Sequence, residues 1–73
     1  MPKLPVLSGE KVCQILSQQG FVKIRQRGSH VIMQMKTGSS TVTIPVPNHK
    51  ELRIGTLQSI IRQSGLPKDI FKT

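Results

Sequence analysis

The sequence predicts an α+β domain with the element order α-β-β-β-α, in which two helices cover one face of a three-stranded antiparallel sheet. Apolar residues recur at helical spacing near both ends of the chain, and they alternate with polar residues in the middle. Glycines and prolines lie at the boundaries between these segments. An antiparallel meander with both helices on its apolar face is the simplest arrangement that buries every apolar stripe.

The first helix is predicted to begin after Ser8. The hydroxyl of a serine at this position can accept a hydrogen bond from an amide of the first turn. Residues 1–7 include two prolines and are interpreted as an N-terminal tail. Gly20 is the expected end of the helix, because glycine adopts the left-handed conformation without a clash. The predicted apolar stripe consists of Val12, Ile15 and Leu16.

A β-hairpin is predicted from Val22 to Met35, with Gly28-Ser29 as its two-residue turn. A loop of this length with glycine first is typical of a type II′ turn. It places Arg27 opposite His30, and the register then pairs Arg25 with Ile32 and Lys23 with Gln34. In this register, His30 shares one face with three cations. The other face collects the apolar side chains of Val22, Ile24, Val31, Met33 and Met35.

The C-terminal half is predicted to contain one more strand and one more helix. Residues 36–40 are interpreted as a polar turn, and Thr41 to Val46 as an edge strand, because proline is tolerated at sheet edges. The second helix is expected to bury Leu57, Ile60 and Ile61 and to end at Gly65. Ile70 and Phe71 are expected to fold back in a short final turn.

The composition bounds the function. With 73 residues, the chain is expected to form a single domain, residues 1–73. Eleven Lys and Arg against three Asp and Glu give a net charge of +8, which favours a polyanionic partner, nucleic acid first. One cysteine, Cys13, excludes an internal disulfide and a zinc ribbon. No long apolar run is present, so we expect neither a signal peptide nor membrane insertion, and a cytoplasmic location.

The residues around His30 suit one reaction, the cleavage of RNA by its own 2′-hydroxyl. Neutral imidazole is a suitable base at neutral pH. Arg and Lys stabilise the negative charge that builds on the phosphoryl oxygens. The candidate catalytic residue is His30, and no metal or other cofactor is expected. The candidate residues for RNA phosphate binding are Lys23, Arg25, Arg27, Gly28, Ser29, His49 and Lys50.

Other interpretations of these residues remain open. On pattern alone, His30 is more often an ordinary half-exposed strand residue, and the cations are compatible with a solvated face. Paired carboxylates, a GxGxxG motif and a P-loop are absent from the sequence.

Three segments of the chain resemble the HicA-type toxins, the small mRNA-cleaving components of toxin–antitoxin pairs. They are SGEKVCQIL, GFVKIRQRGSHVIM and VTIPVPNHKELRIGTLQSIIRQSGL, and the resemblance runs from about Ser8 to Phe71. It implies a fold like that of the double-stranded RNA-binding domain and a ribonuclease without a metal cofactor. It also implies that the histidine of the Gly-Ser-His element, His30, is catalytic and that the partner is a HicB-type antitoxin.

The main alternative is a non-catalytic module that binds double-stranded RNA. Such a module would bind RNA in a salt-sensitive way, would not cleave it, and would be indifferent to the loss of His30. A structural basic protein that binds only within a larger assembly is a third possibility.

Overall fold

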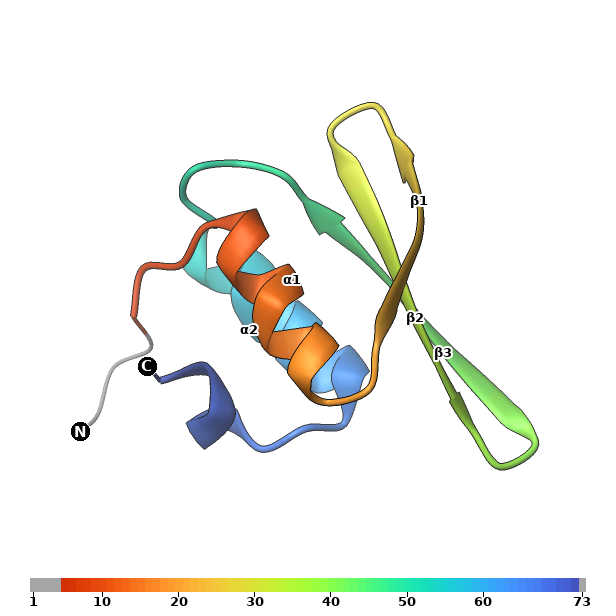
Figure 1. Cartoon of the computed structure of the whole chain (residues 1–73). Helices are drawn as coiled ribbons and strands as arrows, with labels where there is room; N and C mark the ends of the chain where they lie inside the picture. The colour runs from red at the N-terminus through yellow and green to blue at the C-terminus, as the bar shows by residue number, and fades with distance from the viewer. Residues whose placement is uncertain (1–4, 73) are drawn as a thin grey trace.

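The computed structural model describes residues 5–72 and confirms the predicted order of elements (Figure 1). The helices are α1 (Gly9–Gln18) and α2 (Ile54–Ser64), and a short 3₁₀ helix, η1 (Lys68–Phe71), follows. The strands are β1 (Val22–Arg27), β2 (His30–Thr37) and β3 (Ser40–Pro47), joined in the order β1-β2-β3 with antiparallel pairing. Both helices lie on the same side of the sheet, so the α+β prediction is correct.

One hydrophobic core lies between the helices and the sheet. It is aliphatic apart from Phe21 and Phe71, as expected for a chain without Trp or Tyr. Alternate residues of β2 and β3 enter it, and the predicted stripes of both helices are buried. The core consists of Leu7, Val12, Ile15, Leu16, Phe21, Val31, Met33, Ile44, Val46, Leu52, Leu57, Ile60, Ile61 and Phe71.

The segment before α1 differs from the predicted tail. Leu7 is only 6% exposed and belongs to the core. Its carbonyl accepts a hydrogen bond from the Leu52 amide at 2.8 Å, so this segment is fixed to the loop before α2. The first four residues of the predicted tail lie outside the described residues. The cap was predicted correctly, since the Ser8 hydroxyl accepts from the Lys11 amide at 3.0 Å.

Both β-hairpins use the same two-residue turn. Gly28 has φ +56° and Gly38 has φ +58°, and each is followed by a serine. A type II′ turn needs positive φ only at its first central residue, which agrees with the prediction for Gly28-Ser29. The second turn is tighter than the predicted polar segment 36–40, because Thr37 and Ser40 already pair as strand residues.

The register of β1 contains a feature that the alternation of its residues did not predict. Arg27 pairs with His30 and Arg25 with Ile32, as expected, but a β-bulge between Lys23 and Arg25 shifts the rest of the strand. Lys23 therefore pairs with Met33, and Val22 pairs with Gln34. The predicted pair of Lys23 with Gln34 is wrong, and Val22 and Ile24 are 59% and 44% exposed rather than buried. A bulge reverses which face each preceding side chain takes.

The C-terminal segment closes the core. Phe71 is fully buried against the rest of the chain, and Ile70 is half-buried beside it. We expect Phe71→Ala to lower the free energy of unfolding by about 3–5 kcal/mol, because it removes a large buried side chain and leaves a cavity. Urea denaturation followed by circular dichroism measures the change. Val6→Ala, at a position 72% exposed, is the control and should shift the free energy by less than about 0.5 kcal/mol. Equal midpoints for the two variants would contradict the packing described.

Candidate functional site

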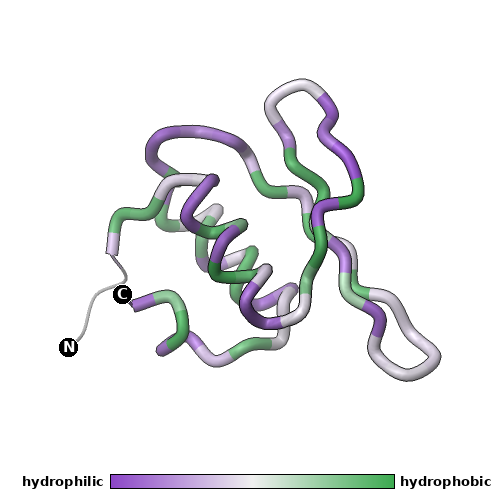
Figure 2. The backbone as a smooth tube through the Cα atoms, viewed as in Figure 1, coloured by the Kyte–Doolittle hydropathy of each residue, from purple (hydrophilic) through white to green (hydrophobic). Residues whose placement is uncertain are grey.

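The helices cover one side of the sheet and leave the other side, the open face, to solvent. Arg27 and His30 sit opposite each other on neighbouring strands, so their side chains project to the same side. Arg25 lies two residues before Arg27 in β1 and joins them on the open face, since it pairs with Ile32. All three of Arg25, Arg27 and His30 are exposed. In Figure 2, hydrophilic residues flank the turn of this hairpin.

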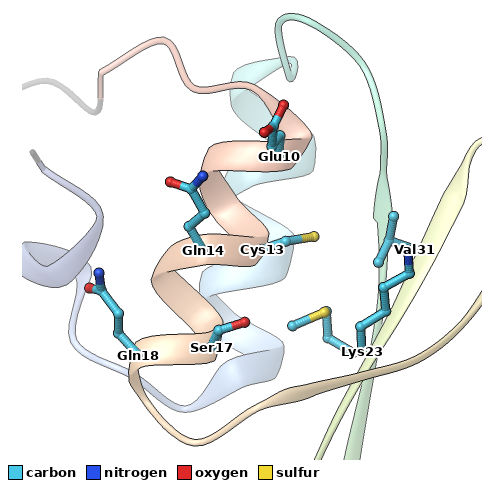
Figure 3. A pocket seen from close by; sticks show the side chains of 8 residues that line it. Glu10, Cys13, Gln14, Ser17, Gln18, Lys23 and Val31 are labelled. Atoms are coloured by element: carbon cyan, nitrogen blue, oxygen red, sulfur yellow. The ribbon is translucent and has the colours of Figure 1, made fainter.

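Lys23 was expected on the same face, but the bulge places it on the side of the helices. Its ammonium donates a hydrogen bond to the Gln26 side chain at 3.3 Å. Figure 3 shows Lys23 across a groove from α1, with the Cys13 thiol pointing into the space between them. The groove has a volume of about 460 Å³, and Glu10, Cys13, Gln14, Ser17, Gln18, Lys23, Val31 and Met33 line it. Lys23 is thus separated from Arg25 and Arg27 by the sheet.

The environment of the groove affects its thiol. Burial raises the pKa of Cys13 above the ordinary value of a cysteine, while the nearby charge of Lys23 acts in the opposite direction and that of Glu10 raises it further. Desolvation disfavours the thiolate, which is the nucleophilic form of cysteine. The thiol is therefore a half-buried packing group rather than an activated nucleophile.

The Gly28-Ser29 turn is held from two sides. The Gln26 side-chain amide donates to the Gly28 carbonyl at 3.2 Å, and the Asn48 backbone amide donates to the Ser29 carbonyl at 2.6 Å. Both turn residues are exposed, and the space around the Gly28 α-carbon is empty. The turn therefore leaves open space next to its backbone at Gly28.

The loop that follows β3 brings His49 and Lys50 to the same end of the molecule. Pro47 pairs with His30, and the chain then passes the Gly28-Ser29 turn at Asn48. His49 and Lys50 are both exposed. Among the predicted site residues, the structure brings together the turn, Arg25, Arg27 and His30, and the loop contacts the turn through the Asn48 amide. His49 and Lys50 follow where the loop passes α1, since the His49 carbonyl accepts from the Gly9 amide, and Lys23 lies on the helix side of β1.

A comparison with protein-family models adds an independent observation. Residues 9–66, from the start of α1 to just past α2, match the family described as the HicA toxin of bacterial toxin–antitoxin systems. The chain belongs to the HicA toxin family. The match spans most of the 73 residues and includes every predicted site residue. A HicA toxin is one half of a toxin–antitoxin pair, so the partner of this chain is an antitoxin. No curated protein and no solved structure matches the chain.

The charge around the site of this HicA toxin is almost all of one sign. Within residues 5–72, the ion pair found is Lys72 with Asp69, at 3.4 Å in the C-terminal segment. The arginines of the open face therefore have no carboxylate partner in the described chain. These guanidinium groups are unpaired and solvated, and arginine is the residue type that matches the geometry of a phosphate with two parallel hydrogen bonds.

Neither a metal site nor a membrane span is found in the part of the chain that the structure describes. Among these residues, no three His, Cys, Asp or Glu side chains lie close enough together to hold a metal ion. None of the described helices of this HicA toxin has the length and apolar character needed to span a membrane.

Sequence reasoning missed two residues that support the turn, Gln26 and Asn48. Gln26 was treated as one more alternating strand residue, although its amide donates to the turn. Asn48 acts through its backbone amide, and any residue except proline supplies that group. Only the closeness of the β3 exit to the β1–β2 turn reveals this contact, and residue types alone carry no signal for it.

Proposed function

We propose that this HicA toxin is an endoribonuclease that cleaves mRNA without a metal cofactor and uses His30 as its catalytic residue. The observation that carries the proposal is the pairing of Arg27 with His30 beside the Gly28-Ser29 turn, on an open and exposed face. An imidazole and a guanidinium that project together into solvent can reach a 2′-hydroxyl and its neighbouring phosphate at the same time.

The reaction follows from the chemistry of RNA. His30 accepts the proton of the 2′-hydroxyl, and the 2′-oxygen attacks the adjacent phosphorus. The bond from phosphorus to the 5′-oxygen then breaks, this oxygen takes up a proton, and a 2′,3′-cyclic phosphate remains. Arg25 and Arg27 stabilise the additional negative charge on the phosphoryl oxygens as it develops.

The remaining residues of the site serve binding. Gly28 leaves room for the RNA backbone, and the exposed Ser29 hydroxyl is available to a phosphate oxygen. His49 and Lys50 extend the contact along the loop after β3. Lys23 lies on the other side of β1. It contacts RNA only if the RNA chain also passes along the groove beside α1. The chain contains no Trp or Tyr, so contacts to the sugar-phosphate backbone dominate over base stacking.

The antitoxin partner is proposed to be of the HicB type. A basic face without internal ion pairs is complementary to an acidic protein surface. A partner that covers Arg25, Arg27 and His30 excludes RNA, which explains how one protein silences the other.

Cleavage in the presence of a chelator tests the proposal. We expect the purified protein to cut mRNA in excess EDTA at an undiminished rate, because no step uses a metal ion. The new 3′ ends should be 2′,3′-cyclic phosphates, which resist alkaline phosphatase until acid opens them to 2′- or 3′-monophosphates. RNA that is 2′-O-methylated throughout is the matched control and should stay intact. Salt-sensitive binding without cleavage would instead identify an RNA-binding module.

A further inference from the structure

The start of α1 makes an unusually close approach to the loop that follows β3. Gly9 is the first residue of α1 and is buried. A Cβ atom added to it would overlap the Pro47 carbonyl oxygen and would lie 2.9 Å from the Asn48 Cα. These obstacles are backbone atoms, which cannot rotate away as the end of a side chain can. Any residue other than glycine at this position must therefore push the helix and the loop apart.

Two hydrogen bonds connect this contact to the candidate site. On one side, the Gly9 amide donates to the His49 carbonyl at 2.8 Å. On the other side, the Asn48 amide donates to the Ser29 carbonyl at 2.6 Å, and Ser29 directly precedes His30. The loop is thus held between α1 and the turn. A displacement of Gly9 is transmitted to His30 through the segment from Asn48 to His49.

Pairing within the sheet strengthens the same connection. Pro47 is the last residue of β3 and pairs with His30. Pro47 also provides the carbonyl against which Gly9 packs. The position of His30 relative to β3 therefore depends on where the Pro47 carbonyl lies, and this depends on Gly9.

The other glycines of the described chain have different roles. Gly20, Gly28, Gly38 and Gly65 have positive φ and serve turns or helix ends. Gly55, near the start of α2, has nothing within 4 Å of an added Cβ. Gly9 is the glycine at which an added Cβ meets main-chain atoms of a distant segment.

We propose that Gly9 is a positioning residue for His30 and acts through the segment from Pro47 to His49. The close packing at Gly9 fixes the Asn48 amide, the amide fixes the Ser29 carbonyl, and the turn then holds the imidazole beside Arg27. The inference rests on the proposed ribonuclease function, and it assigns a role in catalysis to a helix that supplies no reacting group.

The test compares Gly9→Ala with Gly55→Ala, which adds the same methyl group to the start of the other helix. We expect Gly9→Ala to remain folded by circular dichroism and to lose about a hundredfold in kcat, as misplacements of catalytic groups do. Its affinity for fully 2′-O-methylated RNA should be retained, because Arg25 and Arg27 stay on the open face. Gly55→Ala should match the parent in both measurements.

Two further measurements separate positioning from simple loss of structure. By NMR, the His30 ring resonances should move, and the Asn48 amide should exchange faster, in Gly9→Ala but not in Gly55→Ala. Asn48→Pro keeps Gly9 and deletes the amide that binds Ser29, so it should lose kcat in the same way. If Gly9→Ala fails to fold, Asn48→Pro still tests whether the contact from the Asn48 amide to Ser29 positions His30.

Full kcat in a folded Gly9→Ala or Asn48→Pro variant would overturn the inference, and so would unchanged His30 resonances in Gly9→Ala. A failure of the ribonuclease proposal has a different signature, because the parent protein itself would then be inactive. The resonances would still report whether Gly9 positions His30.

Discussion

His30→Ala is expected to slow RNA cleavage by about 10²- to 10⁴-fold, the usual contribution of a general base. The loss should appear in kcat, while the affinity for uncleavable RNA changes little, since the arginines that hold phosphate remain. The fold should be unaffected, because His30 is exposed at the start of β2 and fills no part of the core. Single-turnover cleavage of a defined mRNA measures the rate.

Thr41→Ala is the matched control for this experiment. Thr41 is an exposed residue that pairs with Lys36, at the far end of β2 from His30. The variant should cleave as fast as the parent. If His30→Ala cut RNA at the parental rate, His30 would be an ordinary strand residue and the proposed mechanism would be wrong.

Replacing Arg25 and Arg27 together with Gln should weaken RNA binding and make it less sensitive to salt. Each phosphate contact that is lost lowers the slope of log affinity against log salt by about 0.7 for a single strand. Cleavage should fall as well, because the same guanidinium groups stabilise the transition state. Fluorescence anisotropy with 2′-O-methylated RNA over a series of KCl concentrations measures both the affinity and the slope.

Two comparisons test whether the position of the arginines matters or only their charge. Lys68 and Lys72 lie in and after η1, on the helix side and away from the β1–β2 turn (Figure 1). Changing both to Gln removes the same net charge, and the slope should stay close to that of the parent. Lys23→Gln, on the groove side of β1, should have a smaller effect than either arginine. Equal losses of slope in the two double variants, with about half that loss in Lys23→Gln, would show that RNA responds only to overall charge.

The sequence was sufficient to predict the order of the elements and the pairing of Arg27 with His30. The turn at Gly28-Ser29 alone sets the register of the residue pairs nearest to it. The pairing of Arg27 with His30 therefore follows from residue types and loop length. Helix ends at Ser8 and Gly65 followed from local chemistry in the same way. These features depend on residues close together in the chain, where residue type and spacing carry most of the information.

The errors concern features that depend on distant contacts. Alternation continued from Arg25 back to Val22 would bury Ile24 and place Lys23 on the open face, but a bulge lies there, and no glycine marks it in the sequence. Leu7 was assigned to a tail because its partners, Leu52 and the core, lie far along the chain. The packing at Gly9 belongs to the same class, since its neighbours come from the end of β3.

The bulge in β1 also affects how the protein behaves among its own copies. β1 is an edge strand, and Val22 and Ile24 are exposed on it. The free edge of such a strand can pair with a strand of another molecule. Flat, apolar edges are templates for aggregation, and irregular edges that carry positive charge are poor ones. The bulge at Ile24 and the cations of this strand are features that make an edge a poor template, so we expect β1 not to pair with the β1 strand of a second copy.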